Sequence, residues 1–62
     1  MDPRIRVLED QLFTDGKHWI YAAGPHNAAK PTANIVTGSM FIESDTGTMF
    51  VFDETSAGWT EM

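Results

Sequence analysis

Length, composition and charge limit this chain to one small domain. It has 62 residues, no cysteine, nine acidic and four basic side chains, and a formal net charge of −5 at pH 7. A chain this short buries only about 60% of the surface that its unfolded form exposes, and without cysteine neither a disulfide nor a thiolate zinc site can stabilise it. We therefore expect the chain to depend on a well-packed aromatic core, on self-association or on docking into a larger assembly.

The charge pattern also limits the classes of partner. A nucleic-acid backbone would be repelled by the net negative charge, and the basic residues are too scattered to form a stripe. No apolar run reaches the length of a membrane-spanning helix, and the segment Met1–Arg4 lacks the apolar core of a signal peptide. These features predict a soluble, unprocessed product with no nucleic-acid or membrane partner.

Residues 4–23 are predicted to form a first β-hairpin. Residues 4–7 alternate polar and apolar, which is the period of a half-buried strand, and Asp15-Gly16 is a strong signal for a two-residue hairpin turn. A two-residue turn predicts three opposed pairs, Phe13 with His18, Leu12 with Trp19 and Gln11 with Ile20. Residues 8–13 also place apolar side chains at helical spacing, so a short helical turn there is an alternative.

Residues 24–37 are predicted to form a long irregular loop. Prolines, a glycine and several small or turn-prone residues interrupt any regular pattern in this segment. A connection of this length is long for a compact domain, and such loops are usually functional, mobile or packed against a neighbour.

Residues 38–62 are predicted to form a second hairpin and a short C-terminal strand near Trp59. Ser44-Asp45-Thr46-Gly47 has the composition of a type I turn closed by a left-handed glycine. With a three-residue loop, Ser44 opposes Thr48, and two sets of side chains occupy opposite faces of the hairpin. The expected core face is Met40, Ile42, Phe50 and Phe52, and the opposite face is Phe41, Met49 and Val51.

Both of these faces are apolar, whereas a face in contact with water normally reads as polar. The sheet is therefore expected to be covered on both sides, by the rest of the chain or by another molecule. The predicted fold is all-β: a small antiparallel meander of two hairpins plus a short C-terminal strand, joined by a long irregular loop, in a single domain over residues 1–62.

Four acidic residues near the turns raise two catalytic or metal-binding hypotheses. Asp45-Thr46-Gly47 is the triplet of aspartic proteases, in which two such loops share a proton between paired carboxylates; however, polar residues precede Asp45 here, and a hairpin turn uses the same residues. A calcium site could use Glu43, Asp45, Asp53 and Glu54, but their spacing lacks the alternating oxygen ligands of an EF-hand loop. We expect no metal site and no cofactor.

Two histidines and three large aromatic residues are further candidates for a functional role. His18 and His26 have no nucleophile or third ligand at a suggestive spacing. Trp19, Tyr21 and Trp59 combine an apolar body with a polar group, as residues of sugar-binding and protein-binding surfaces often do, but they also suit the core of a small β protein.

Residues 30–59, about half of the chain, resemble a module found in small structural proteins of tailed bacteriophages. The matching elements, in chain order, are Lys30-Pro31-Thr32, Gly38-Ser39, Phe41, Glu43-Ser44-Asp45-Thr46-Gly47, Phe50-Val51-Phe52-Asp53 and Trp59. Similar proteins are head fibres, decoration proteins and tail or baseplate components. The resemblance implies a structural role in a virion, and it carries over no catalytic residues.

The resulting expectation is a non-enzymatic structural subunit of a bacteriophage virion, made in the cytoplasm of the host bacterium. Its expected partners are further copies of itself and other virion proteins. The expected protein interface comprises Phe41, Met49, Val51, Trp19, Tyr21 and Trp59. The alternative is a small monomeric, phage-encoded binding module that recognises a host protein or a glycan through exposed aromatic residues. A dimeric acid hydrolase that uses Asp45 is a third hypothesis.

Overall fold

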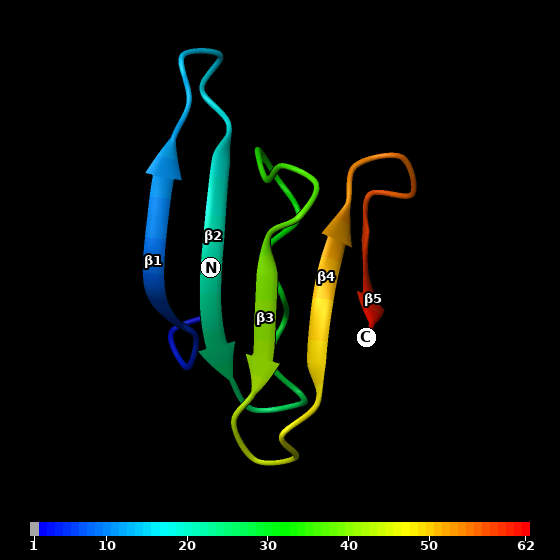
Figure 1. Ribbon diagram of the computed structural model, residues 1–62. Coiled ribbons are helices and arrows are strands. Elements are labelled where there is room, and N and C mark those ends of the chain that lie inside the picture. Colours follow the sequence, from blue (N-terminus) through cyan, green and yellow to red (C-terminus); the bar gives the residue numbers. More distant parts are fainter. Residues whose placement is uncertain (1) are drawn as a thin grey trace.

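Five strands form one sheet in the order in which they occur along the chain (Figure 1). The computed structural model describes residues 2–62. The strands are β1 (Arg6–Leu12), β2 (His18–Gly24), β3 (Met40–Glu43), β4 (Met49–Asp53) and β5 (Gly58–Glu61). The expectation of an all-β chain is confirmed for the described residues, and the alternative helical turn over residues 8–13 is wrong because most of that segment belongs to β1.

The sheet is mixed, whereas a purely antiparallel meander was expected. β1 pairs antiparallel with β2, β3 with β4, and β4 with β5, but β2 and β3 are parallel. The reason is the connection over residues 25–39, which returns the chain to the opposite end of the sheet before β3 begins (Figure 1). A parallel pair requires such a crossover, because a tight turn can only reverse the chain direction.

The first hairpin turn is one residue longer than predicted. Phe13 N–H donates to the Lys17 carbonyl at 2.9 Å, so Thr14-Asp15-Gly16 forms a three-residue loop in which Gly16 has φ = 86°. Gln11 therefore opposes Trp19, and the predicted pairing of Leu12 with Trp19 is wrong. A shift of one residue changes which side chains share a face, because strand side chains alternate.

The second hairpin shows the same one-residue shift. Glu43 N–H donates to the Thr48 carbonyl at 2.8 Å, and Gly47, with φ = 77°, closes a four-residue loop over Ser44–Gly47. Phe41 consequently opposes Phe50, and Met40 opposes Val51. The predicted pairs of Ile42 with Phe50 and Met40 with Phe52 are wrong, because Ser44 belongs to the loop and the strands begin to pair one residue earlier, at Glu43 and Thr48.

The corrected register assigns the aromatic side chains to one side of the sheet, which we call the inner face. It comprises Ile20, Ala22, Phe41, Phe50, Phe52 and Trp59. Phe41 is fully buried and Phe52 is 2% exposed. Trp59 packs edge-on against both rings, with centroid distances of 5.9 Å to Phe41 and 5.1 Å to Phe52, so these three rings form the centre of the core.

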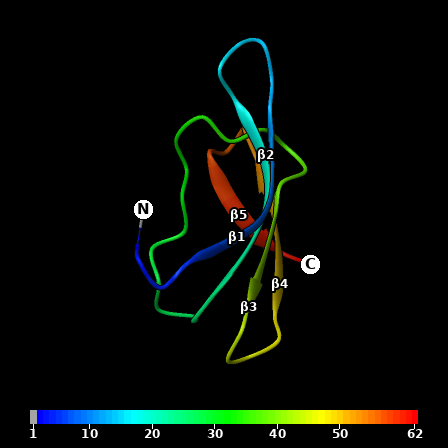
Figure 2. The same cartoon turned by 90° about the vertical axis from the view of Figure 1, so that its left-hand side faces the viewer.

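Residues 25–39 cover the inner face. Figure 2 shows most of this connection, together with the N-terminal segment, on one side of the sheet; the last part of the connection crosses over just before β3. The Trp59 indole N–H donates to the Pro31 carbonyl at 2.8 Å, and Ala28 and Ile35 of the connection are buried. The predicted irregular loop is therefore the second layer of the domain, and it supplies the cover that a one-sheet chain needs.

Ser39 joins the end of this connection to the sheet. The side chain is fully buried, and its hydroxyl accepts a hydrogen bond from the Ile20 N–H at 3.0 Å. Its backbone carbonyl also accepts from the Phe52 N–H at 2.9 Å. One small polar residue thus satisfies backbone donors of β2 and β4, just before β3 begins.

A buried ion pair completes the inner face near the second turn. The Lys30 ammonium lies 3.1 Å from the Glu43 carboxylate, and both side chains are less than one-fifth exposed. The same ammonium lies 4.5 Å from the ring centroid of Phe50 and 5.0 Å from that of Phe41, within the range of a cation–π contact. The pKa of Glu43 is lowered by a hydrogen bond from the Thr46 hydroxyl and by Lys30, although burial opposes this shift.

Candidate protein-binding face

The other side of the sheet, which we call the outer face, is apolar, and no segment of residues 2–62 forms a layer over it. Alternation along β2, β3 and β4 assigns to it Trp19, Tyr21, Ala23, Met40, Ile42, Met49 and Val51. All seven residues are half-buried, because neighbouring side chains on the sheet shield one another. Figure 2 shows most of the connecting segment on the opposite side of these strands, and only its end near Gly38, whose carbonyl accepts from Trp19, crosses over just before β3. An apolar sheet face without a second layer is typical of an interaction surface.

Four of the six predicted interface residues lie on this face: Trp19, Tyr21, Met49 and Val51. Phe41 does not, because the register shift places it on the inner face, where it is fully buried. That part of the prediction is wrong. Met40 and Ile42, which were expected in the core, occupy the outer face for the same reason.

Trp59 is also on the inner face, which separates it from the other large aromatic residues. Its indole N–H is bonded to Pro31, whereas the Trp19 indole N–H donates to the Gly38 carbonyl at 2.9 Å. Trp19 and Tyr21 alternate with the buried Ile20 and point to the outer face. The three aromatics therefore do not form one platform, and both indole donors already have partners within the chain.

Charged side chains lie at the margins of the outer face. On β1, Arg6 and Glu9 are cross-strand partners of Ala23 and Tyr21, and Asp53 ends β4 on the other side. Glu43 is directed to the inner face, where it meets Lys30. Among residues 2–62, the middle of the outer face consequently carries no carboxylate and no ammonium group, although the chain as a whole is acidic.

A second group of exposed apolar side chains lies along β1 and its turn. Val7, Leu8, Leu12 and Phe13 are 37–65% exposed. β1 is an edge strand in which all seven residues are exposed, and Figure 1 shows the β1–β2 turn extending beyond the rest of the sheet. This exposure differs from the expectation, because the alternation of residues 4–7 predicts a half-buried strand.

The Asp45 triplet forms an ordinary turn with a histidine bound to it. Asp45 accepts the His26 N–H at 3.0 Å and contacts the ring Nδ1 at 2.6 Å. The hydrogen bond from the His26 ring lowers the pKa of the Asp45 carboxyl. An acid-hydrolase dyad would require a second carboxylate that shares a proton with it, whereas the partner here is an imidazole that favours the ionised form.

His18 has a similar partner, since its Nδ1 lies 2.7 Å from the Asp10 carboxylate. Within residues 2–62, each histidine ring is hydrogen-bonded to its aspartate, and no hydroxyl is positioned on either ring as a nucleophile. Two carboxylates of the calcium hypothesis are also engaged, Glu43 with Lys30 and Glu54 with Lys17. No group of three or more potential metal ligands is found in the described part of the chain.

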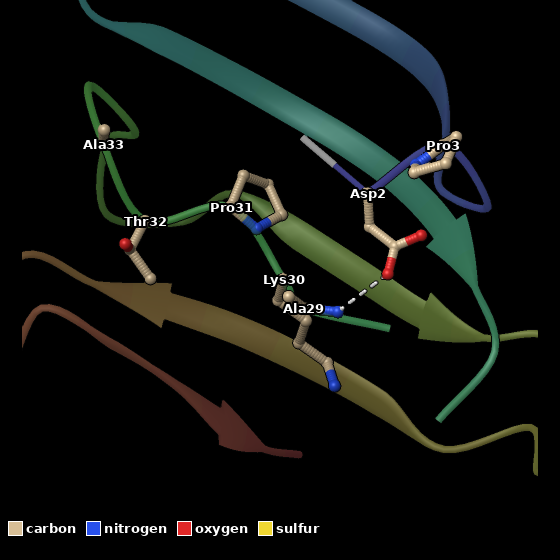
Figure 3. A pocket seen from close by; sticks show the side chains of 7 residues that line it. All are labelled: Asp2, Pro3, Ala29, Lys30, Pro31, Thr32 and Ala33. Atoms are coloured by element: carbon tan, nitrogen blue, oxygen red, sulfur yellow. Dashed lines mark hydrogen bonds between the residues drawn. The ribbon is translucent and has the colours of Figure 1, made fainter. Parts of the chain in front are cut away.

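A pocket of about 660 Å³ lies between the N-terminal segment and the connection (Figure 3). Its lining includes Asp2, Lys30 and Pro31. Asp2 is already bound by the Arg4 guanidinium at 2.8 Å and by the Ala29 N–H at 3.4 Å, and Lys30 is bound to Glu43. The charged groups of this pocket are thus satisfied within the chain, and the outer face is the better candidate site.

No helix in residues 2–62 is long and apolar enough to span a bilayer. Comparisons with protein-family models, with curated proteins and with solved structures gave no match for this chain.

Proposed function

We propose that this chain is a non-enzymatic structural subunit that works through protein–protein contacts on the outer face of its sheet. The observation that carries the proposal is the uncovered apolar surface formed by β2, β3 and β4, with Trp19, Tyr21, Met40, Ile42, Met49 and Val51. Each of these three strands has a neighbouring strand on both sides, so their backbone groups are paired within the sheet. A partner that covers the face therefore buries apolar side chains without burying unpaired backbone groups.

The resemblance of residues 30–59 to small phage structural proteins directs the proposal to a virion, as a capsid decoration, head fibre or tail component. Several of the matched residues have structural roles that such a module would retain. Ser39 bonds the Ile20 backbone, and Trp59 holds the connection onto the inner face at Pro31. In this proposal the inner face makes the subunit stable, and the outer face joins it to other proteins of the particle.

Mass spectrometry of purified particles tests the virion assignment. Particles would be isolated on a density gradient from an induced lysate of the bacterium that carries the gene. Peptides of this chain are expected to co-purify with the particles in a constant ratio to the major capsid protein. Peptides that remain in the soluble fraction, with none in the particles, would contradict the assignment.

The alternative is a monomeric module that binds a host protein or a glycan through aromatic side chains. It is favoured by the pair Trp19 and Tyr21 on the outer face, whereas Trp59 cannot contribute to the same surface. Fluorescence of a Trp59→Phe variant isolates Trp19. Quenching of Trp19 by a soluble glycan or host extract, with the protein monomeric, would favour this alternative.

A further inference from the structure

We propose that the free edge of β1 accepts an extended, basic segment of another protein, which adds to the sheet as a further strand. β1 lies at the end of the strand order, so one of its edges has no neighbour among residues 2–62. It has seven residues, whereas β5 at the other edge has four. Open backbone groups on a strand edge recognise a partner by main-chain hydrogen bonds, and this geometry requires an extended partner. The inference concerns a contact surface separate from the outer face.

The hydrogen-bond pattern shows which groups of β1 are open. In an antiparallel pair, opposed residues alternate between hydrogen-bonded and non-hydrogen-bonded pairs. The His18 and Ile20 N–H groups donate on the side of β2 that faces away from β1, at 2.7 and 3.0 Å. Their cross-strand partners on β1 are Leu12 and Asp10. The N–H and carbonyl groups of Leu12 and Asp10 therefore point away from β2, toward the free edge.

The regular part of this edge lies next to the first turn. A β-bulge between Val7 and Glu9 interrupts the ladder, and bulges on edge strands hinder further pairing. From Glu9 the register with β2 is regular as far as Leu12, and the Phe13 N–H continues it to the Lys17 carbonyl. From Glu9 to Phe13 the sequence contains neither lysine nor proline, which often block an exposed edge. The added strand is therefore expected to pair with this stretch.

The side chains of the same stretch indicate the chemistry of the partner. Glu9 is exposed and forms no ion pair within residues 2–62, and Asp15 adds a carboxylate in the adjacent turn. Leu12 is 65% exposed and lies on the opposite side of the strand from Glu9, because strand side chains alternate. A partner strand that alternates basic and apolar residues would place cations beside Glu9 and apolar side chains beside Leu12.

A second copy of the chain is a poor match for this edge. Two copies repel each other at a net charge of −5, and pairing of two β1 strands would gather the Glu9 and Asp10 carboxylates of both copies along one short stretch. A basic segment is instead attracted by the charge of the whole chain, which increases the rate of encounter. The charge distribution thus favours a different protein as the source of the strand.

Titration calorimetry with a synthetic peptide tests the edge. The probe is a seven-residue peptide of alternating lysine and valine with blocked ends, and the control peptide has glutamate in place of lysine. The basic peptide is expected to bind at least about tenfold more tightly than the acidic one. Leu12→Pro removes an open N–H that β2 does not use, so it should weaken binding at least about tenfold. Leu12→Thr is the matched control: it also removes the leucine side chain but keeps the N–H, and it should bind more tightly than Leu12→Pro.

Amide hydrogen exchange of the wild-type chain locates the added strand. The Asp10 and Leu12 N–H groups should exchange at least about fivefold more slowly when the basic peptide is bound. The Gln11 N–H is directed to β2 and is the internal reference, whose exchange should change less. This measurement needs no variant, so it decides the question even if Leu12→Pro does not fold.

Three results would overturn the inference: no binding of the basic peptide at millimolar concentration, equal binding of the acidic peptide, or unchanged exchange at Asp10 and Leu12 in saturating peptide. In purified particles, a carbodiimide that joins carboxylates to amines should link Glu9 to a lysine of a different protein, and a link to a second copy alone would also contradict it. Absence of the chain from particles would contradict only the virion role, because peptide binding is measured on the isolated chain.

Discussion

The inner and outer faces of the sheet are both apolar, but only one of them is a core. The inner face has large aromatic rings, a buried Lys30–Glu43 pair and a layer of connecting chain held by Trp59. The outer face has aliphatic and methionine side chains and two aromatics, and the described part of the chain places no layer over it. Hydrophobicity alone therefore does not show which of the two faces becomes the core. The position of the connecting segment decides this.

The largest expected difference between the faces comes from two adjacent residues of β3. Phe41→Ala should reduce the free energy of unfolding by about 3–5 kcal/mol, because it leaves a cavity beneath Trp59 and Lys30. Ile42→Ala should have a much smaller effect on the isolated subunit, since its side chain is only half-buried on the outer face. Urea unfolding, at a concentration at which the chain is monomeric, measures the loss of stability in both variants. A larger loss for Ile42→Ala than for Phe41→Ala would contradict this register and favour the one predicted from sequence, in which Ile42 is in the core.

Replacement of Ser39 should cause the next largest loss of stability, and it tests how the connection is joined to the sheet. Ser39→Ala leaves the Ile20 N–H without its acceptor in a fully buried site, which should cost about 1–3 kcal/mol. Ser44→Ala, in the exposed second turn, is the control and should stay within about 0.5 kcal/mol of the wild type. Equal stabilities of the two variants in thermal unfolding would argue against the Ser39 contact.

Acid should destabilise the inner face and leave the middle of the outer face unaffected. The pKa of Glu43 is lower in the folded chain than in the unfolded chain, so its ionised form stabilises the fold above its unfolded pKa. That contribution is lost as the pH falls through the folded-state pKa. The stability difference between wild type and Glu43→Gln should therefore shrink below pH about 4. A difference that is independent of pH in urea titrations would show that the ion pair does not stabilise this face.

The smallest expected change in stability comes from a substitution outside both faces, in the turn between β4 and β5. Ala57 has φ = 53°, a left-handed conformation that is unfavourable for a residue with a Cβ atom. Ala57→Gly should therefore stabilise the chain by about 0.5 kcal/mol, after allowance for the greater freedom of glycine in the unfolded state. A small rise in the thermal midpoint is expected, and a fall would indicate that the turn is not strained.

The two hairpins show which features local sequence signals predict correctly and which they do not. Asp15-Gly16 and Ser44–Gly47 located both turns, but each loop contains one residue more than predicted, Thr14 in the first and Ser44 in the second. That single residue reversed the faces of Phe41 and Ile42. The prediction that both faces are apolar did not depend on the register, whereas the choice of which residues form the interface did.

By itself the sequence determined the all-β character of residues 2–62, the positions of the turns and the presence of apolar side chains on both sides of residues 40–52. These properties follow from local propensity and from the alternation of side chains. Only the tertiary structure decided that β2 and β3 run parallel, that residues 25–39 cover one face, and that Phe41 rather than Ile42 is in the core. These features depend on contacts between residues far apart in the chain, such as Trp59 with Pro31 and Ser39 with Ile20, which no local pattern encodes.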